Sequence, residues 1–195
     1  MSKRVILVTG TPCVGKTTLA LKLAAALNGQ YINLTELAEK EQLTMGKDPE
    51  RDTIIIDEAK MFRKLKQVIT ETDNVNIIID GHYAAAVTPK NSVTNILVLR
   101  RNPAELRQLM QKCGFNQLKL DENIAAEILD VCLVEALREF PKEKICELDT
   151  TGKSEDETFK DALAILDGSQ RCSVGGIDWL GMLERQGKLD EYLKT

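Results

Sequence analysis

The sequence predicts an α/β fold in which a parallel sheet of five strands lies between two layers of helices. Short apolar runs alternate along the chain with segments of helical periodicity, which is typical of buried parallel strands joined by covering helices. A glycine-rich loop joins the first expected strand to the first expected helix. The expected strands are 4–9, 30–33, 75–80, 95–100 and 144–148, and the expected helices are 16–28, 34–42, 58–72, 103–113, 121–140 and 155–167.

The first strand and helix flank a phosphate-binding motif. Residues 10–18 read GTPCVGKTT and match the pattern G-x-x-x-x-G-K-[ST]. Gly10 and Gly15 allow the backbone to turn its N–H groups inward around phosphate oxygens. The loop opens onto a helix N-terminus, whose partial positive charge favours the same anion. An apolar strand, this loop and a helix in that order predict a P-loop NTPase domain, built as a three-layer sandwich.

The chemistry of the motif assigns roles to its side chains. Lys16 is expected to contact the β- and γ-phosphates of a nucleoside triphosphate, and the Thr17 hydroxyl to bind Mg²⁺. Thr18 is assigned to the α-phosphate side. Lys16 is therefore the first candidate catalytic residue.

A second carboxylate-bearing strand should hold Mg²⁺ through water. The runs 54–57 and 77–80 both read Ile-Ile-Ile-Asp, so spacing alone does not separate Asp57 from Asp80. The run that ends at Asp80 is the better strand, whereas Asp57 leads straight into a helix that it could simply cap. We expect Asp80 to serve the metal and Asp57 to lie near the second substrate.

The single histidine, His82, follows Asp80 by two residues. Lone histidines are more often packing or surface residues. This one follows the carboxyl end of an expected strand, where open α/β sheets bind their ligands, and that position favours a functional role.

Two later helices begin with capping sequences. Residues 102–105 read Asn-Pro-Ala-Glu, and residues 154–157 form the capping box Ser-Glu-Asp-Glu. The helix expected at 121–140 carries one apolar face, interpreted as core. That face consists of Ile124, Ile128, Cys132, Ala136 and Phe140.

Composition excludes several classes of protein. A net charge of −4 disfavours broad electrostatic binding to nucleic acid. No apolar run approaches the roughly 20 residues that span a bilayer, and the N-terminus does not resemble a signal peptide. The five cysteines form no C-x-x-C, which predicts free thiols, no zinc site and no disulfide framework. We therefore expect a cytoplasmic protein without membrane contact.

The composition changes at 168–176, which predicts a joint between a P-loop kinase-type domain at 1–168 and an amphipathic tail at 169–195. The tail contains the only tryptophan, Trp179. It either docks on its own domain or offers a surface to a partner or a second copy.

Taken together, these motifs resemble the archaeal adenylate kinases of the family related to the coilin-interacting nuclear ATPase. The resemblance covers essentially the whole chain. It is carried by residues 10–18, 31–34, 37–38, 41–43, 57–58, 80–82, 98–100, 114–115, 122–128 and 135–136. Residues 149–153 and 177–179 resemble the archaeal branch in particular.

The resemblance implies a fold of the nucleoside monophosphate kinase type, with a monophosphate-binding segment at about 30–56 and a short lid at about 112–122. In this family, the Asp80-x-His82 unit is associated with ATP hydrolysis. The implied substrates are ATP with Mg²⁺, and AMP; a small-subunit platform ribosomal protein is an implied partner, in ribosome maturation and rRNA processing. The implied ATP-binding residues are Gly10, Cys13, Gly15, Lys16, Thr17, Thr18 and Cys113, and the implied monophosphate-binding residues are Asn33 and Asp57.

Cys13 departs from the family pattern, because relatives have glycine at this position. If the position requires a positive φ, a β-carbon there costs about 1 kcal/mol. A thiol beside a helix N-terminus is also expected to have a lowered pKa.

The expected lid departs as well. Cys113 and Leu109 stand where relatives have arginines, which make bidentate contacts with phosphate. Glu39 stands where eukaryotic relatives have an arginine, with Lys40 adjacent. The cations that would compensate are Arg107, Lys112 and Lys119.

Three functions stay open at this point. The first is a Mg²⁺-dependent nucleoside monophosphate kinase that converts ATP and AMP into two ADP by direct in-line transfer, with Lys16, Asp80 and His82 as its catalytic residues. The second is a nucleotide-gated ribosome-assembly factor with ATPase but little kinase activity. The third is a small-molecule kinase, because such enzymes share the loop and the fold.

Overall fold

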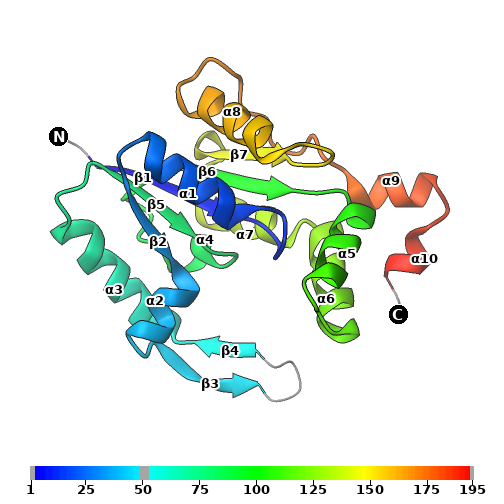
Figure 1. Ribbon diagram of the computed structural model, residues 1–195, viewed down its shortest axis with the longest axis horizontal. Coiled ribbons are helices and arrows are strands. Elements are labelled where there is room, and N and C mark those ends of the chain that lie inside the picture. Colours follow the sequence, from blue (N-terminus) through cyan, green and yellow to red (C-terminus); the bar gives the residue numbers. More distant parts are fainter. Residues whose placement is uncertain (1–2, 49–52, 194–195) are drawn as a thin grey trace.

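The structure is a computed structural model that describes residues 3–48 and 53–193 (Figure 1). Its centre is a five-stranded parallel sheet in the order β2-β5-β1-β6-β7. The strands are β1 (Arg4–Thr9), β2 (Gln30–Asn33), β5 (Asn76–Asp80), β6 (Val93–Arg100) and β7 (Ile145–Asp149). All five strands expected from the sequence are confirmed, because their apolar runs are the buried ones.

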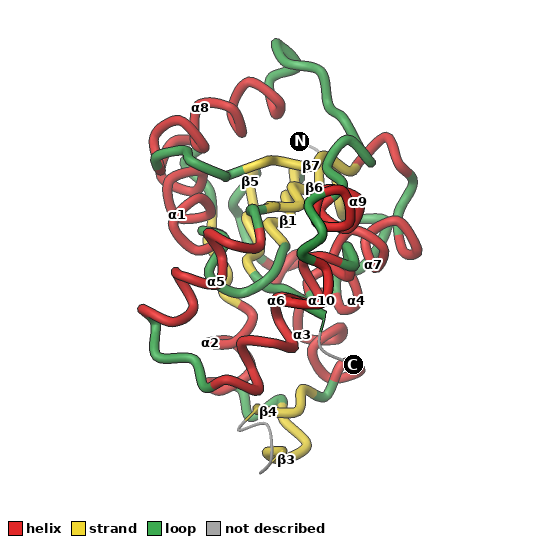
Figure 2. The backbone as a smooth tube through the Cα atoms, turned by 90° about the vertical axis from the view of Figure 1, so that its right-hand side faces the viewer, coloured by secondary structure: helices red, strands yellow, loops and turns green. Residues whose placement is uncertain are grey.

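Helices cover both faces of this sheet (Figure 2). Alternate residues of each strand enter opposite cores, as Leu7 and Ile6 of β1 do. One face carries α2 (Leu34–Lys40), α3 (Glu58–Glu71), α4 (Ala84–Val87) and α7 (Val131–Glu139). The other carries α1 (Lys16–Ala26), α5 (Pro103–Lys112), α6 (Gln117–Ile128) and α8 (Glu155–Leu166). The three-layer α/β sandwich is thereby confirmed, and a short 3₁₀ turn, η1 (Lys142–Lys144), leads into β7.

The prediction of a single helix at 121–140 is wrong. The structure divides it into α6 and α7 at Asp130, whose φ is 58°. The Asp130 carboxylate accepts a hydrogen bond from the Arg100 guanidinium at the end of β6. The break sends Ile128 into one core and Ala136 into the other, so the predicted single apolar face serves both sides of the sheet. The helix that precedes the break, α6, begins at Gln117, within the expected lid.

A β-hairpin outside the main sheet was not among the expected strands. β3 (Thr44–Asp48) pairs antiparallel with β4 (Thr53–Ile56), and the pair projects away from the sheet beyond α2 (Figure 1). Ile55 is 44% exposed, so this apolar run is not a buried core strand. The hairpin falls within the expected monophosphate-binding segment, of which 49–52 lie outside the described residues.

The C-terminal segment docks on its own domain, which is one of the two alternatives left open by the sequence. It forms α9 (Trp179–Arg185) and α10 (Leu189–Tyr192). Trp179 and Leu183 are 8% and 2% exposed and belong to the core that contains α6. The Arg107 guanidinium of α5 lies 4.2 Å from the centre of the Tyr192 ring.

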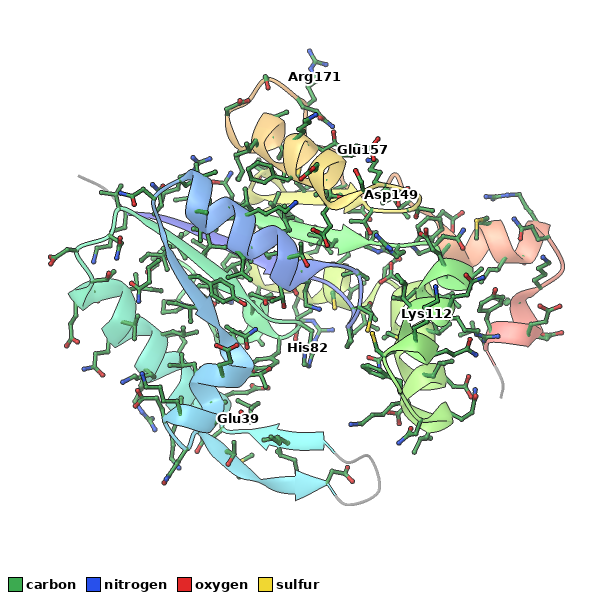
Figure 3. The ribbon with its side chains drawn as sticks, viewed as in Figure 1. Glu39, His82, Lys112, Asp149, Glu157 and Arg171 are labelled. Carbon is green, nitrogen blue, oxygen red and sulfur yellow. A yellow bond between two sulfur atoms is a disulfide. The ribbon has the colours of Figure 1, made fainter. Side chains whose placement is uncertain are left out.

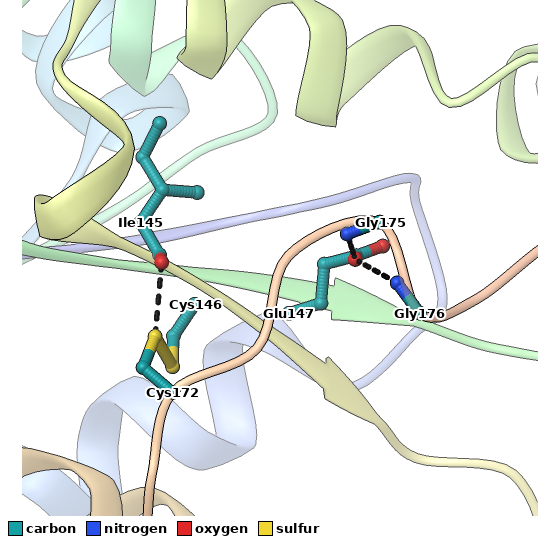
Figure 4. The surroundings of a disulfide bond; sticks show 6 residues. All are labelled: Ile145, Cys146, Glu147, Cys172, Gly175 and Gly176. Atoms are coloured by element: carbon teal, nitrogen blue, oxygen red, sulfur yellow. Dashed lines mark hydrogen bonds between the residues drawn. A yellow bond between two sulfur atoms is a disulfide. The ribbon is translucent and has the colours of Figure 1, made fainter.

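The expectation of free thiols is wrong for two of the five cysteines. A disulfide joins Cys146 of β7 to Cys172, with the two Cα atoms 5.2 Å apart (Figure 4). The segment after α8 turns back along β7, where the Glu147 N–H donates to the Ser173 carbonyl at 3.0 Å. This backbone contact brings together two cysteines that are 26 residues apart in sequence.

Among the helices of the described residues, none combines the length and apolar character that a membrane crossing requires.

Helix α3 offers a direct test of the core on the hairpin side of the sheet. Leu65 is fully buried there, whereas Phe62 of the same helix is 41% exposed. We expect Leu65→Ala to lower the free energy of unfolding by about 2 to 5 kcal/mol, because it leaves a cavity. Phe62→Ala, the control, should cost less than about 1 kcal/mol. Urea denaturation measures both, and equal losses would contradict this packing.

Candidate functional site

The phosphate loop connects β1 to α1 and depends on left-handed backbone at three of its residues. Gly10, Cys13 and Gly15 have φ values of 137°, 67° and 102°. At Gly10 an added β-carbon would lie 2.4 Å from the Leu99 carbonyl oxygen, so only glycine fits. From the sequence, a cost is expected at Cys13 if this position requires a positive φ. Its φ is positive, so the β-carbon of Cys13 carries that conformational cost.

Lys16 lies across this loop. Its Nζ donates a hydrogen bond to the Thr11 carbonyl oxygen at 2.8 Å. Burial of the ammonium lowers the pKa of Lys16, and the negative charge of Asp80 opposes that shift. The lysine is thus held over the loop, at the place where the motif predicts phosphate.

Thr17 and Asp80 meet as expected from the sequence. The Thr17 hydroxyl donates to Asp80 Oδ2 at 2.6 Å, and the Asp80 side chain is almost fully buried. The Tyr31 hydroxyl and Asn33 Nδ2 donate to the same oxygen, each at 3.1 Å. A hydroxyl and a carboxylate side by side are the hard oxygen donors that Mg²⁺ prefers.

Asn33 caps a helix in addition to donating a hydrogen bond to Asp80. Its Oδ1 accepts from the backbone N–H groups of Thr35 and Glu36 at 2.9 and 3.1 Å, which caps α2. Tyr31 was not among the candidate residues. Side chains alternate between the two faces of a strand, so Tyr31 lies on the same face of the edge strand β2 as Asn33. This alternation is the sequence signal that could have identified Tyr31.

Asp57 caps α3, as the alternative interpretation of the sequence allowed. Its Oδ1 accepts from the Lys60 N–H at 3.0 Å, and its Oδ2 lies 3.3 Å from Lys60 Nζ. The hydrogen bond from the Lys60 backbone lowers the pKa of this carboxyl group. The contact of Asp57 with a monophosphate stays a prediction.

His82 lines a cavity of about 720 Å³ beside the phosphate loop. Pro12 of the loop and Phe115, Lys119 and Asn123 of the expected lid and α6 share its lining. The imidazole is drawn in Figure 3, below the N-terminal end of α1. The surrounding protein and the positive charge of Lys16 lower the pKa of His82 to about 4. The ring is therefore neutral at pH 7 and can donate or accept a hydrogen bond.

A second cavity of about 300 Å³ also borders the loop, and it shares no lining residue with the first. Cys13, Gly15 and Thr18 line it from the loop side, and Arg101 and Lys153 line it from the loops after β6 and β7. Arg101 was not a sequence candidate. Its Nε donates to Thr150 Oγ1 at 2.9 Å, so its position depends on a contact between two strand ends that are distant in sequence.

The expected lowering of the Cys13 pKa is wrong. Burial and the neighbouring Cys113 thiol raise the pKa of Cys13 to about 11, and Lys16 opposes this only in part. Burial and Cys113 therefore outweigh the positive charge of Lys16 at this thiol. The same contact brings Cys113, at the C-terminal end of α5, next to the loop.

The cations expected to compensate for missing lid arginines have separate positions. Arg107 faces the C-terminal segment, where its guanidinium also donates to the Glu191 carbonyl at 3.2 Å. Lys119 lines the larger cavity, and Lys112 ends α5. Glu39 lies on α2, toward the β3–β4 hairpin (Figure 3).

Relatives identify the family of the chain. Residues 6–130 match a family model described as an AAA domain. The chain is 35% identical over 180 residues to a protein of Pyrococcus furiosus, which covers 92% of this chain and 93% of the relative. It is 37% identical over 177 residues to a protein of Methanocaldococcus jannaschii, with 89% and 92% covered. Both relatives bear the name "Putative adenylate kinase".

Solved structures share the fold. Thymidylate kinase from Candida albicans superposes with a TM-score of 0.56 at 15% identity, over 86% of this chain and 92% of that one. Shikimate kinase from Aquifex aeolicus superposes with a TM-score of 0.51 at 20% identity, over 85% and 97%.

The single histidine makes its charge state directly measurable. We expect the ring protons of His82 to titrate in NMR spectra with a midpoint well below 6.5, because Lys16 and the surrounding protein disfavour the imidazolium. The unfolded chain then binds more protons than the folded chain between about pH 4 and 6.5, so this group makes stability fall as pH falls through that window. A midpoint at 6.5 or above would contradict the site geometry.

Proposed function

Because this chain belongs to the same family as the archaeal proteins named as adenylate kinases, we propose that it is a Mg²⁺-dependent nucleoside monophosphate kinase that transfers the γ-phosphate of ATP to AMP. The observation that carries the proposal is the contact of Thr17 with Asp80 at 2.6 Å, beside Lys16 in the phosphate loop. In P-loop enzymes, a hydroxyl and a carboxylate in this arrangement hold the metal.

The residues present fit a magnesium ion that is shared with a nucleotide. Thr17 and Asp80 would hold it, with Asp80 acting through water. Tyr31 and Asn33 orient the Asp80 carboxylate by donating to its Oδ2. When bound, Mg²⁺ neutralises charge on the phosphates and orients them. The described residues contain no group of three His, Cys, Asp or Glu side chains able to hold a metal without the nucleotide.

Two cavities flank the phosphate loop and fit two substrates. The cavity of about 300 Å³ lined by Thr18, Arg101 and Lys153 would take the nucleoside of ATP. The cavity of about 720 Å³ lined by His82, Lys119 and Asn123 would take the acceptor, with Asn33 and Asp57 as its further proposed contacts outside that lining. Cys113, next to Cys13, would contact ATP from the lid side. Loop residues line both cavities, so a γ-phosphate held by the loop would lie between the leaving ADP and the acceptor, as in-line transfer requires.

The chain's own groups then act by position and charge. Lys16 exchanges its hydrogen bond with the Thr11 carbonyl for one with the β- and γ-phosphates. The neutral imidazole of His82 orients the acceptor, or a water molecule, in the larger cavity. No covalent intermediate is required, because positioning and electrostatic stabilisation supply the catalysis in phosphoryl transfer.

The alternative proposal is an ATPase in which water replaces AMP. One observation favours it: among the described residues that line the larger cavity, Lys119 is a cation but none is an arginine. A single lysine supplies less bidentate contact with an acceptor phosphate than arginines do. Action on a small molecule other than a monophosphate is a third proposal, which rests on the shared fold.

A part in small ribosomal subunit maturation is proposed on the sequence resemblance alone. The partner would be a ribosomal protein of the small-subunit platform. Binding of that purified protein, measured with ATP, with ADP and without nucleotide, tests this role separately from the chemistry.

Lys16→Ala tests the proposed chemistry. We expect the rate of ADP formation from ATP and AMP to fall by a factor of about 100 to 1,000, because charge on the transferred group loses its stabilisation. Lys22→Ala is the matched control, because Lys22 lies on the same helix but pairs with Asp156 at 2.6 Å on the surface. Circular dichroism should show both variants folded, and full activity of Lys16→Ala would overturn the proposal.

Phosphate release by the wild-type protein separates the two activities. With ATP alone, a kinase should release little phosphate, and adding AMP should stimulate ADP formation. Phosphate release that is rapid and indifferent to AMP would replace the kinase proposal with the ATPase. A panel of other monophosphates in the same assay identifies the preferred acceptor.

A further inference from the structure

A buried carboxylate connects the phosphate loop to the C-terminal segment. Glu127 of α6 is 2% exposed. Its Oε2 accepts a hydrogen bond from the Thr11 hydroxyl at 2.6 Å. Its Oε1 accepts from Arg100 Nε at 2.9 Å and from the Trp179 indole N–H at 3.0 Å. One side chain therefore contacts the loop, the end of β6 and the tail.

Thr11 connects Glu127 to Lys16 through two hydrogen bonds. While its hydroxyl is held by Glu127, its carbonyl oxygen accepts from Lys16 Nζ at 2.8 Å. Thr11 is 2% exposed, so water does not substitute for the missing contact if Glu127 moves. The position of Glu127 thus sets where the start of the loop, and the lysine above it, lie.

The tail supplies donors that the buried charges need. Arg100 is the guanidinium shared by three carboxylates, those of Glu127, Asp130 and Glu147. Buried carboxylates without donors are costly. The tail provides N–H groups to two of them, because the backbone around Gly175 donates to Glu147 and the Trp179 indole donates to Glu127.

We propose that Trp179 and Glu127 are positioning residues for the phosphate loop, so that docking of the C-terminal segment sets the affinity of the site for a nucleoside triphosphate. The inference rests on the proposed function, because it requires the loop to bind Mg²⁺-ATP. Neither residue touches the substrate. Trp179 holds Glu127, Glu127 holds Thr11, and Thr11 holds the loop.

Trp179 is also a built-in reporter, because it is the only tryptophan in the chain. Binding of Mg²⁺-ATP draws Lys16 away from the Thr11 carbonyl and shifts the hydrogen bonds of Glu127. We expect the emission of Trp179 to change as Mg²⁺-ATP is added, with the midpoint that titration calorimetry gives. In Thr11→Val the nucleotide should still bind, more weakly, but the change in emission should be lost. Thr11→Ser, which keeps the hydroxyl, should restore it.

Trp179→Phe keeps an aromatic ring but removes the indole N–H. We expect its Kd for Mg²⁺-ATP to rise about tenfold, because the nucleotide-bound loop would depend on this contact by about 1.4 kcal/mol more than the free loop does. The matched control is Leu183→Ala, which leaves a cavity under the same docked helix but removes no hydrogen-bond donor from Glu127. It should lower Tm but leave Kd unchanged when both variants are measured far below their melting temperatures.

The outcomes distinguish this inference from the proposed function. If wild-type protein binds Mg²⁺-ATP by calorimetry but Trp179 emission stays constant and Trp179→Phe binds as tightly, the positioning role is overturned and the proposed function stands. If Leu183→Ala weakens binding as much as Trp179→Phe, general loosening of the tail replaces the specific contact. Absence of binding by the wild-type protein overturns both.

Discussion

The hydrogen bond between Thr17 and Asp80 is the contact on which the site depends. It forms because β1 and β5 are parallel neighbours, with Val8 paired to Asp80, so that one strand leads into the loop where the other presents its carboxylate. The apolar strands fix this register by filling two cores at once. A shift of one residue would exchange the two faces and remove Asp80 from the loop. The packing that fixes the strand register therefore also fixes the position of the proposed metal-binding pair, Thr17 and Asp80.

Much of this arrangement could be predicted from the sequence, because the signals are local. Apolar runs indicate the parallel strands, and the glycine pattern indicates the loop. Parallel strands end at the same edge, so the meeting of Thr17 and Asp80 could be predicted once the strand ending at Asp80 was preferred to the run ending at Asp57. That preference rested on the residues immediately C-terminal to each aspartate. Asp57 does cap α3, as expected for an aspartate that leads directly into a helix.

The parts that could not be predicted depend on contacts between distant segments. Asp130 breaks the expected helix with a left-handed residue whose carboxylate meets Arg100, and no periodicity signals that. The Cys146–Cys172 pair depends on the tail's path along β7. The raised pKa of Cys13 depends on burial and on Cys113, so reasoning from the helix N-terminus alone gave the wrong sign.

The disulfide has a consequence for the integrity of the chain. It closes a covalent ring that contains α8 and the exposed loop before Cys172. A protease that cuts this loop at Arg171 severs the backbone without releasing either piece, because both remain joined through sulfur (Figure 4). The nicked protein migrates as one species on a non-reducing gel and as two once a reductant is added. A single scission in this surface loop therefore leaves the two pieces covalently joined wherever the surroundings keep the disulfide oxidised.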